Sequence, residues 1–389
     1  MAKKVVILGA GYAGLVTALK LNKLASAGDC EIILVNKHDY HQMITQLHES
    51  AAGAKSDRDI RIPLASVLKG KNIKFIKDTV EAIDKQAKQV KLKSQVLSYD
   101  YLVVSLGSES EYFGIPGLKE YSFSLKSINQ ARLIRIHIEK CFADYHYDPT
   151  PDKLTFVVGG AGFSGIELVG ELADALPKLA EENNIPYERV KLYNVEAAPM
   201  ILPGFDEELV KVAEHSLKSR GVNFLVGVPI IRVEPGKVHL KNGEIIETQT
   251  LVWTGGVRGS QIVIDAGFET EPRGRAKVDE YLRAIGHEDV FIIGDSCFVM
   301  NEETGRPYPP TAQIAIQMGE NCAANLYASI KGTQKEKFVP NLLGSVASLG
   351  RKDAIGKVGK SLKTKGWIAY RIKDMSQVRY LAKIGMIFK

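Results

Sequence analysis

Cysteine is scarce in this sequence, and no two cysteines stand at a spacing typical of a metal or redox site. No Cys-x-x-Cys occurs, and the four cysteines lie far apart, at Cys30, Cys141, Cys297 and Cys322. This usage is typical of a protein in a reducing cytoplasm. It excludes a zinc or iron–sulfur centre held by a cysteine framework, and it also excludes a dithiol redox motif.

Long apolar runs are missing as well. No run approaches the length of about 18 residues that a membrane-spanning helix needs. The first strand is expected directly after Lys4, which leaves no room for a signal peptide. We therefore expect a chain that does not cross a bilayer. Its 389 residues, 45% of them hydrophobic, are enough for a large core and for two or three domains.

Three of the eight histidines, His38, His41 and His48, lie close together in the sequence. Their spacing fits no common metal motif, and no cysteine or acid pair completes a ligand set. We therefore expect these histidines at the surface or stacked on other rings, and we expect no metal site.

Positive charge is concentrated at the C-terminus. Residues 351–389 include 11 Lys and Arg but only two acids, a net charge of +9, whereas the whole chain carries +6. The remainder of the chain therefore carries −3. A basic tail on a mildly acidic body indicates an anionic partner, either lipid headgroups or nucleic acid. The alternative is a solvated tail with no partner.

The N-terminus has the order of a dinucleotide-binding βαβ unit. An apolar strand leads into Gly9-Ala-Gly-Tyr-Ala-Gly14, a helix follows, and the next strand ends at Asn36-Lys37. Gly9 allows a tight turn, Gly11 lets backbone N–H groups approach a pyrophosphate, and Gly14 lets the helix pack on the strand. An acid usually binds the ribose where Asn36 stands. An amide can still bond a ribose hydroxyl, and Lys37 adds a cation.

The same order recurs 151 positions later. An apolar strand leads into the glycines Gly160, Gly162 and Gly165, and the strand that follows ends in Glu196. A carboxylate at that position can accept both ribose hydroxyls and would repel a 2′-phosphate, so we expect this site to prefer NADH over NADPH. Two loops in one register predict two dinucleotide sites. The alternative for each loop is a glycine turn that serves packing alone.

The helix after the second loop carries two glutamates that the first copy lacks. Glu167 and Glu171 are four residues apart and share one helix face, and the helix is expected to end at Pro177. Like charges at this spacing are mutually unfavourable, so each glutamate is expected to have a partner, a raised pKa or a chemical task. The alternative is a pair of solvated surface acids.

Two later strands end in glycine turns, near Gly107 and Gly256, where the chain is expected to cross between nucleotide domains close to a cofactor. A further strand delivers Asp295 after a glycine, and a carboxylate there can bind polyol hydroxyls such as the ribityl chain of a flavin. The following helix is expected to run through Tyr327, with Thr311 as its N-cap. Its positive end would point at whatever covers the loop.

This order of parts resembles the two-dinucleotide-binding flavoprotein family over nearly the whole chain and, within it, the type II NADH:quinone oxidoreductases. The residues that carry the resemblance are Ala312-Gln-Ile-Ala-Ile-Gln317, Asn36-Lys37, the two glutamates after the second loop, and the basic C-terminus. It implies an α/β fold with two Rossmann-like dinucleotide-binding domains (the FAD/NAD(P)-binding fold) and a C-terminal basic amphipathic membrane-binding segment. It also implies non-covalent FAD at the first loop, NADH at the second, and two-electron reduction of a membrane quinone, expected to be menaquinone, without ion pumping.

The resemblance further implies roles for particular positions. Glu167 falls beside the nicotinamide and flavin, Gln317 in the quinone channel, and Lys373 at the quinone site, and these three are the expected catalytic residues. The expected cofactor-binding residues are Gly9, Gly11, Gly14, Asn36, Lys37, Thr45, Gly107, Gly160, Gly162, Gly165, Glu196, Gly256, Asp295, Ala312 and Gln313.

The expected domains follow the same order. Residues 1–113 and 259–327 form a discontinuous FAD domain, 114–151 a helical connection, 152–258 the NADH domain, and 340–389 a membrane-association region. The expected partners are NADH, the quinone, an anionic lipid surface and a second copy of the chain, with no nucleic acid. The expected location is the cytoplasmic face of the cell membrane, as a peripheral protein.

The tail supports a membrane role on its own pattern. A helix from Trp367 places Ile368, Ile372, Met375 and Ala382 on one face and Lys373, Ser376, Tyr380 and Lys383 on another. The alternative for this helix is docking to a partner or to a second copy. Two rival functions stay open at this stage. One is a sulfide:quinone oxidoreductase, whose chemistry needs cysteines beside the flavin, and the other is a soluble NADH-dependent reductase of a ferredoxin-type protein.

Overall fold

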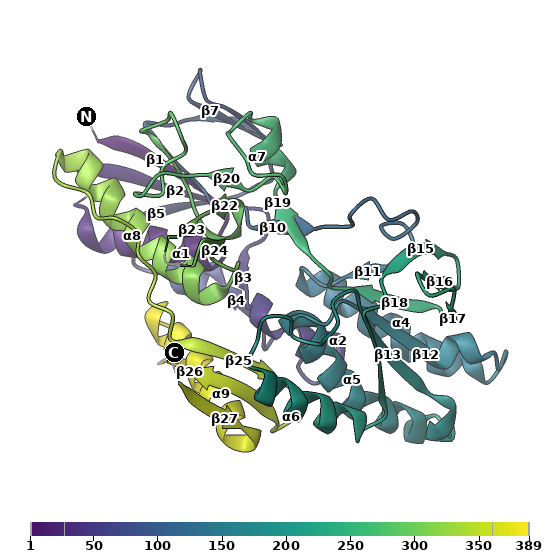
Figure 1. Ribbon diagram of the computed structural model, residues 1–389. Coiled ribbons are helices and arrows are strands. Elements are labelled where there is room, and N and C mark those ends of the chain that lie inside the picture. The colour runs from purple at the N-terminus through teal and green to yellow at the C-terminus, as the bar shows by residue number, and fades with distance from the viewer. Residues whose placement is uncertain (1, 27, 303, 360, 388–389) are drawn as a thin grey trace.

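The computed structural model describes residues 2–26, 28–302, 304–359 and 361–387. Two parallel five-stranded sheets form the centres of its two halves (Figure 1). The first has the order β21 (Val290–Ile292), β9 (Tyr101–Val104), β1 (Lys3–Leu8), β2 (Cys30–Asn36), β5 (Ile73–Lys77). The second has the order β11 (Phe123–Ser124), β18 (Thr250–Trp253), β12 (Thr155–Gly159), β13 (Lys191–Glu196), β14 (Val222–Val226). The α/β fold with two Rossmann-like sheets is confirmed.

The central strands are apolar because both of their faces are buried in the core. β1 pairs in parallel with β2, with Val5 opposite Ile32, and all of Val5 to Leu8 are fully buried. Runs of Val, Ile and Leu suit a strand of this kind. Helices α1 (Tyr12–Leu24) and α8 (Ala312–Lys331) lie side by side on the first sheet. Gly319 allows this close approach, since a Cβ there would lie 2.5 Å from the carbonyl oxygen of Ala13.

The duplication seen in the sequence extends beyond the glycine loops. Each half also carries a three-stranded antiparallel sheet, and the two crossings between the halves pair with each other as a short antiparallel ribbon. The first sheet is β6 (Val80–Asp84), β7 (Gln89–Leu92) and β8 (Val96–Ser98), the second is β15 (Ile230–Glu234), β16 (Lys237–Leu240) and β17 (Ile245–Glu247), and the ribbon is β10 (Ser108–Ser110) with β19 (Val257–Gly259).

The remaining elements are shorter or cover the sheets. The helices are α2 (Leu47–Ala51), α3 (Leu64–Leu68), α4 (Ile128–Tyr145), α5 (Phe163–Glu182), α6 (Glu207–Lys218) and α7 (Gln261–Asp265), with 3₁₀ turns η1 (Ile44–Gln46), η2 (Pro151–Leu154), η3 (Tyr187–Arg189) and η4 (Gly294–Ser296). The short strand pairs are β3 (Tyr40–Gln42) with β4 (Arg61–Pro63), β20 (Ala276–Lys277) with β22 (Cys297–Phe298), and β23 (Met300–Asn301) with β24 (Arg306–Pro307).

Two predicted helix ends have opposite outcomes. Thr311 caps α8 as predicted, because its hydroxyl accepts a hydrogen bond from the Ile314 N–H at 3.3 Å. The prediction that α5 ends at Pro177 is wrong, because the helix continues to Glu182. A proline inside a helix costs roughly 3 kcal/mol. Buried apolar residues on both sides of it, Leu176 and Ala180, keep the helix on the core.

The C-terminal region forms a small unit of its own beside the two halves. A three-stranded antiparallel sheet, absent from the sequence-based expectation, precedes a long helix (Figure 1). Within the described residues, no helix combines the length and the hydropathy that crossing a membrane requires. The elements are β25 (Gly344–Ser348), β26 (Ala354–Val358), β27 (Leu362–Lys365) and α9 (Gly366–Lys383).

This unit touches the second half at a glycine. A Cβ on Gly170, in α5, would lie 2.3 Å from the carbonyl carbon of Leu349 and 2.6 Å from the nitrogen of Gly350. Both atoms belong to the backbone, so neither can move without moving the C-terminal sheet. Helix α5 and the C-terminal unit therefore require glycine where they meet.

We predict that Gly170→Ala lowers the stability of the protein although alanine is the better helix former. The backbone clash should cost about 1–3 kcal/mol, which exceeds the propensity gain of up to about 1 kcal/mol. Thermal and urea unfolding would measure the loss. Gly28→Ala is the matched control, since a Cβ at Gly28 meets nothing within 4 Å. Equal stability of the two variants would contradict the prediction.

Candidate functional site

The first glycine loop has the shape that a bound pyrophosphate requires. Gly9 has φ of +97°, which favours glycine, and a Cβ on Gly14 would lie 2.0 Å from the carbonyl oxygen of Gly9. The Ser105 hydroxyl, at the end of β9, lies 3.0 Å from the same carbonyl oxygen and 2.7 Å from that of Leu8. The side-chain oxygen of Asn36 accepts the Ala10 N–H at 3.0 Å. Local glycine geometry and two side chains therefore fix this turn.

The second loop repeats this construction nearly atom for atom. Gly160 has φ of +98°, and a Cβ on Gly165 would lie 2.0 Å from the carbonyl oxygen of Gly160. The Thr254 hydroxyl, at the end of β18, lies 3.2 Å from that oxygen, in the role of Ser105. Glu196 accepts the Ala161 N–H at 2.6 Å, in the role of Asn36. The sequence repeat is thus a structural repeat.

Both loops fit a dinucleotide phosphate on their outer side. A Cβ on Gly11 or on Gly162 would meet no atom within 4 Å, and no side chain caps the helix that either glycine begins. The first N–H groups of α1 and α5 therefore have no capping side chain. Such helix ends bind anions through these N–H groups and the positive end of the helix dipole.

The two ribose positions differ in charge. Glu196 accepts backbone N–H groups on both oxygens, from Ala161 and, at 2.8 Å, from Ala198. A carboxylate has about four acceptor sites, so two remain for ribose hydroxyls. The Asn36 amide also donates to the carbonyl oxygen of His38 at 2.8 Å, and the Lys37 side chain beside it is exposed. The first site is therefore the less acidic of the two.

The crossing ribbon brings the other predicted cofactor residues to the first sheet. Asp295 accepts a hydrogen bond from Ser108 at 3.0 Å, and Lys126 donates to the same Ser108 hydroxyl at 2.9 Å. Gly107 has φ of +75°, and its carbonyl oxygen accepts the Ser296 hydroxyl at 3.0 Å. These contacts hold Asp295 at the carboxyl edge of β21, where ligands bind in sheets of this kind.

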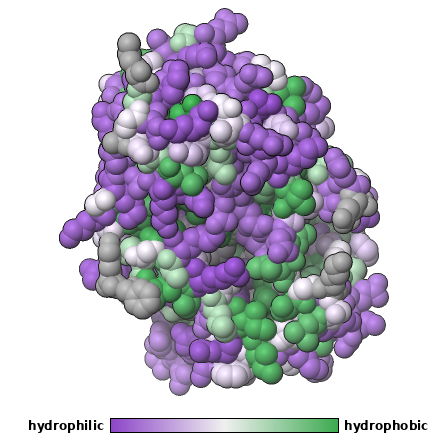
Figure 2. Space-filling model, turned by 90° about the vertical axis from the view of Figure 1, so that its left-hand side faces the viewer, coloured by the Kyte–Doolittle hydropathy of each residue, from purple (hydrophilic) through white to green (hydrophobic). Residues whose placement is uncertain are grey.

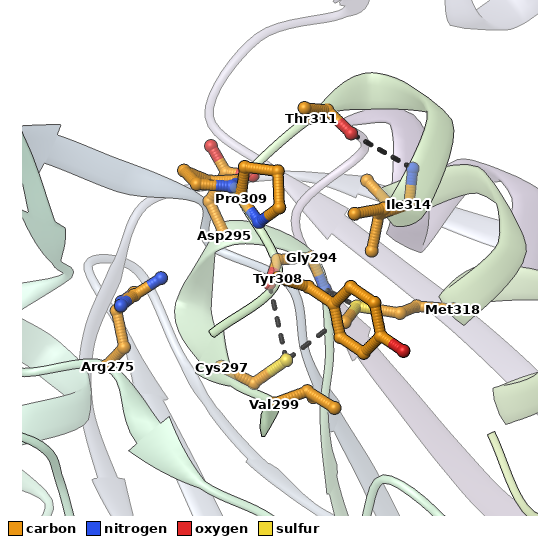
Figure 3. A pocket seen from close by; sticks show the side chains of 12 residues that line it. Arg275, Gly294, Asp295, Cys297, Val299, Tyr308, Pro309, Thr311, Ile314 and Met318 are labelled. Atoms are coloured by element: carbon orange, nitrogen blue, oxygen red, sulfur yellow. Dashed lines mark hydrogen bonds between the residues drawn. The ribbon is translucent and has the colours of Figure 1, made fainter. Parts of the chain in front are cut away.

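A narrow hollow lies between Asp295 and the start of α8 (Figure 3). Thr311, Ile314 and Ala315 line this hollow. Ala312 and Gln313, two predicted cofactor residues, lie in the first turn of α8 between them. Thr45, another predicted cofactor-binding residue, forms a hydrogen bond with the Tyr12 hydroxyl at 3.0 Å. Gly256, at the second crossing, packs against Phe113, whose ring a Cβ would meet at 2.9 Å.

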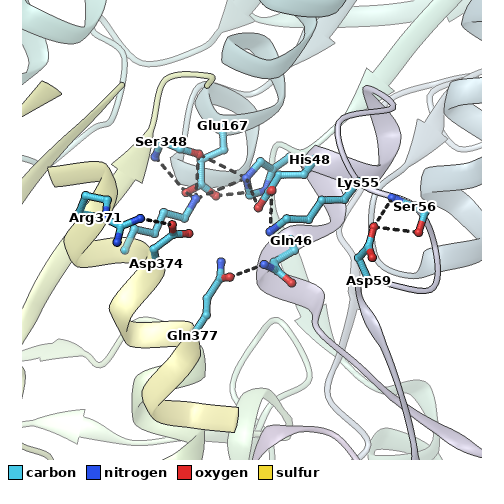
Figure 4. Close-up of polar contacts among 12 residues, drawn as sticks. Gln46, His48, Lys55, Ser56, Asp59, Glu167, Ser348, Arg371, Asp374 and Gln377 are labelled. Atoms are coloured by element: carbon cyan, nitrogen blue, oxygen red, sulfur yellow. Dashed lines mark hydrogen bonds and ion pairs between the residues drawn. The ribbon is translucent and has the colours of Figure 1, made fainter. Parts of the chain in front are cut away.

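A second cluster of charged groups joins α5 to α9 (Figure 4). Lys373 donates all three of its hydrogens. They go to Glu167 Oε1 at 2.5 Å, Ser348 Oγ at 2.8 Å and His48 Nε2 at 3.4 Å. The other Glu167 oxygen lies 3.6 Å from His48 Nδ1. Four elements, α2, α5, β25 and α9, therefore each contribute one polar side chain.

The state of His48 follows from these contacts. Burial lowers its pKa well below the ordinary value, and the neighbouring Lys373 and Lys55 charges lower it further. The ring is therefore neutral near pH 7. Since Lys373 donates to Nε2, the single ring proton lies on Nδ1, facing Glu167. The cluster holds one carboxylate, one ammonium and one neutral imidazole, a set that can hold and pass protons.

Glu171 lies one helical turn from Glu167 in a different environment. Its side chain is 5% exposed and lines a hollow between α2, α4 and α5 together with Arg135, Lys178 and Arg351. Burial, together with the nearby Glu49 and Asp174 charges, raises its pKa to about 7, although the Lys373 and Arg351 charges act in the opposite direction. The two glutamates that sequence analysis paired thus have different environments: one is ion-paired and the other is a buried acid with a raised pKa.

The structure brings together two of the three predicted catalytic residues. Glu167 and Lys373 form the ion pair, whereas the Gln317 amide is engaged with the backbone of Asn341, donating to its oxygen at 3.0 Å and accepting its N–H at 2.8 Å. Two members of the cluster, His48 and Ser348, were not predicted. Sequence analysis named His48 only as one of three neighbouring histidines, and it gave no role to Ser348.

The expectation that these histidines lie at the surface or stack on other rings is wrong for His48. His38 stacks on Tyr40 with ring centroids 4.8 Å apart, as expected. His41 is buried, and its ring packs against Tyr12 and Tyr380 with centroids 5.1 Å and 5.5 Å away. His48 is buried in the charged cluster, with Nε2 3.3 Å from the Ser348 hydroxyl. No group of three or more potential metal ligands occurs in the described part of the chain. All four cysteines are buried free thiols.

Comparison with known proteins identifies relatives over the whole chain. Residues 3–319 match the model of the pyridine nucleotide-disulphide oxidoreductase family. The chain is 41% identical over 394 residues to a Staphylococcus saprophyticus protein named type II NADH:quinone oxidoreductase, covering 100% of this chain and 98% of the relative.

Solved structures agree in fold. NDH2 of Plasmodium falciparum in complex with NADH has a TM-score of 0.87 at 17% identity, covering 99% of this chain and 98% of that one. The sulfide:quinone oxidoreductase of Aquifex aeolicus has a TM-score of 0.80 at 22% identity, covering 98% and 91%. These identities support a shared fold, with β-sheets and helices in the same arrangement.

We predict that Glu171→Gln changes how stability depends on pH. The folded protein binds a proton at Glu171 up to about pH 7, whereas the unfolded chain loses it near the ordinary value of 4.5. The stabilising contribution is therefore complete below pH 4.5 and lost as the pH rises through 7. Glutamine stays neutral, so the variant should be more stable than the wild type at pH 8, by up to roughly 3 kcal/mol. At pH 4.5 the two should be equal.

Urea unfolding between pH 4.5 and pH 8 would measure this difference. Glu181→Gln, an exposed position on the same helix, is the control and should leave the pH profile unchanged. Parallel profiles of Glu171→Gln and the wild type would show that Glu171 does not titrate in this range.

Proposed function

The chain belongs to the type II NADH:quinone oxidoreductases of the pyridine nucleotide-disulphide oxidoreductase family, and we propose that it divides this reaction between the two glycine loops and the Glu167–Lys373 cluster. It is an FAD-dependent enzyme that oxidises NADH and reduces a quinone. Bound FAD supplies the redox chemistry, since a flavin can accept a hydride and pass on two electrons. The protein contributes binding, orientation and protons.

We assign FAD to the first loop and NADH to the second. Gly9, Gly11 and Gly14 would hold the FAD pyrophosphate, and Asp295 would bond the ribityl hydroxyls. The Glu196 carboxylate would bind the ribose of NADH and disfavour NADPH. This assignment makes 1–113 and 259–327 the FAD domain, 114–151 the connection and 152–258 the NADH domain.

The observation that carries the proposal is the 2.5 Å ion pair between Glu167 and Lys373. It places a proton-donating ammonium and a proton-accepting carboxylate where the helix after the NADH loop meets α9. Reducing a quinone to a quinol takes up two protons. Lys373 Nζ can hold and donate a proton at this place, and Glu167 can restore it, with the Ser348 N–H, 3.3 Å from Glu167 Oε1, helping to orient the carboxylate. Gln317, on α8, is assigned to the quinone channel from the family resemblance.

The attachment to a membrane is assigned to the outer face of α9 and region 340–389. Ile368 and Met375 are 62% and 67% exposed, and Trp367 and Val378 are exposed beside them. Hydrophobic side chains gather in the lower part of the molecular face that this unit occupies (Figure 2). An apolar helix face beside a net charge of +9 over 351–389 suits an anionic lipid surface. We assign this surface to the cytoplasmic face of the cell membrane.

The finer proposals concern the quinone, ion transport and assembly. We propose menaquinone as the acceptor, reduction without ion pumping, and a homodimer. Reduction of a menaquinone analogue tests the choice of acceptor. Proteoliposomes with an internal pH dye test the absence of ion pumping, and we expect no pH change inside them beyond that caused by the protons of the substrates. Light scattering of the detergent-solubilised enzyme tests the third.

The experiment that tests the function as a whole is anaerobic and sequential. NADH added to the FAD-loaded protein should bleach the yellow flavin absorbance, and a menaquinone analogue added next should restore it. Bleaching without reoxidation by any quinone, but with reoxidation by a ferredoxin, would replace the proposal with the protein-reductase alternative.

We predict that Glu167→Gln separates the two half-reactions. Flavin reduction by NADH should stay within about twofold of the wild type. Reoxidation by the quinone should slow by about a hundredfold, because the amide cannot accept or relay a proton. Stopped-flow absorbance measures both steps. Glu181→Gln on the same helix is the control, and an unchanged reoxidation rate and pH profile in Glu167→Gln would contradict the role of Glu167.

We predict that replacing Ile368 and Met375 together with glutamine weakens binding to anionic vesicles. The two side chains should contribute about 1.5–3 kcal/mol each when fully buried in the interface, so the loss should be at least tenfold. Vesicle sedimentation with phosphatidylglycerol measures it. The matched control replaces Leu133 and Ile136 of α4, which are 56% and 50% exposed, and should bind as the wild type does. Equal losses of vesicle binding in both variants would contradict the assignment of membrane binding to α9.

A further inference from the structure

A chain of hydrogen bonds connects α9 with the first glycine loop. His41, which is 0% exposed, lies between them, with Nδ1 2.8 Å from the carbonyl oxygen of Ala10 and Nε2 3.0 Å from the hydroxyl of Tyr380. Tyr380 is buried as well, and its ring lies against that of Tyr12, with centroids 4.5 Å apart. Residues 10, 41 and 380 are far apart in the sequence, so only the folded protein forms this chain.

The Ala10 carbonyl oxygen, at one end of this chain of hydrogen bonds, determines which atom donates in each of them. A carbonyl oxygen can only accept, so His41 Nδ1 carries the ring proton and donates it to Ala10. Burial lowers the pKa of His41 to about 4, so the ring has no second proton near pH 7 and Nε2 must accept. The Tyr380 hydroxyl therefore donates to Nε2. The Ala10 carbonyl thus sets the tautomer of His41, and the Tyr380 hydroxyl holds the ring in place through Nε2.

Holding the Ala10 carbonyl also orients the next N–H of the loop. In a planar trans peptide the C=O group and the following N–H point in opposite directions. The Ala10 oxygen faces His41, so the Gly11 N–H points to the opposite side of this peptide. Beside it, a Cβ on Gly11 would meet nothing within 4 Å. The Ala10 N–H is held by Asn36. Both polar groups of Ala10 are therefore fixed, and the N–H that would face a phosphate is fixed with them.

The second loop provides an internal comparison. Its equivalent carbonyl, on Ala161, accepts the backbone N–H of Leu202 at 2.7 Å, and its N–H is held by Glu196. A backbone N–H has no alternative tautomer, so it needs no side-chain partner to keep it a donor. The first loop alone relies on side chains for this bond, and the last of them belongs to the C-terminal helix.

We propose that Tyr380 is a positioning residue for FAD, which acts through His41 and the Ala10 carbonyl to orient the Gly11 N–H toward the pyrophosphate. Tyr380 itself touches neither loop glycine nor ligand. The inference rests on the proposed assignment of FAD to the first loop. It adds a cofactor-retention role to a helix whose opposite face is assigned to the membrane.

Tyr380→Phe tests the proposal. Without the hydroxyl, Nε2 has no hydrogen-bond partner, so the ring is held less firmly and its Nδ1–H bond to the Ala10 oxygen weakens. The loss of one such hydrogen bond corresponds to roughly threefold to tenfold weaker FAD binding. Two measurements on the FAD-loaded enzyme report it: the fluorescence of FAD released on dilution, and the increase in Tm caused by excess FAD. Tyr380→Phe should release FAD more readily on dilution, and excess FAD should raise its Tm less than it raises that of the wild type.

The controls separate positioning from general loss of structure. Tyr370→Phe removes a hydroxyl from the same helix and should retain FAD as the wild type does. His41→Asn supplies an amide donor near the position of Nδ1 and removes the Nε2 atom that accepts from Tyr380, so Tyr380→Phe should have no further effect in that background. This double-variant cycle tests the chain of bonds even where Tyr380→Phe alone lowers overall stability.

Three outcomes would overturn the proposal. They are FAD release from Tyr380→Phe at the wild-type rate, an equal fall in Tm with and without added FAD, and an additive effect of the two substitutions. If the first loop bound NADH instead, Tyr380→Phe would weaken binding of NAD⁺, used as an unreactive probe, and leave FAD in place. That result would identify the loop assignment as the error, whereas failed quinone reduction would change neither measurement.

Discussion

The arrangement of the C-terminal unit depends on the ion pair between Lys373 and Glu167. It is the first of several polar contacts that α9 makes along one stripe: Gln377 with Gln46, Tyr380 with His41 and Lys383 with Glu320 follow it at helical spacing. Buried polar groups are costly unless paired, so rotating the helix would leave several partners unsatisfied. The rotation of α9 is therefore fixed by its polar face.

This orientation of α9 is the opposite of that of most surface helices. An amphipathic helix commonly buries its apolar stripe in the protein and exposes its charges. Here the polar stripe faces the protein, so the apolar residues around Ile368 and Met375 face outward. One set of hydrogen bonds thus completes the proton-handling cluster and at the same time presents an apolar surface. The site and the outer surface are two consequences of a single helix orientation.

The sequence predicted the parts of the molecule whose geometry is local. The glycine loops and the Thr311 cap follow from residues a few positions apart, and Asn36 and Glu196 end the strand that comes next after each loop, so their pattern is visible in one chain. Burial that depends on distant segments was not visible. Pro177 lies inside a helix because of packing by Leu176 and Ala180, and His41 and His48 are buried because α9, more than 300 residues later, supplies their partners. Lys373 was placed by family resemblance, whereas His48 and Ser348 carried no motif. The sheet of β25, β26 and β27 was missed because its three short strands have a weak alternating pattern.

The duplicated loops show which local differences matter for function. Their backbone angles at Gly9 and Gly160 agree within one degree, so the fold imposes the same phosphate-binding turn twice. They differ in what holds the carbonyl after the first glycine. Leu202 fixes the second loop with a backbone donor from its own half, which leaves that loop independent of the rest of the chain. A substrate that enters and leaves in each turnover needs a loop of this kind. The first loop depends on His41 and through it on the last helix, an arrangement that suits a cofactor that stays bound while that helix is in place.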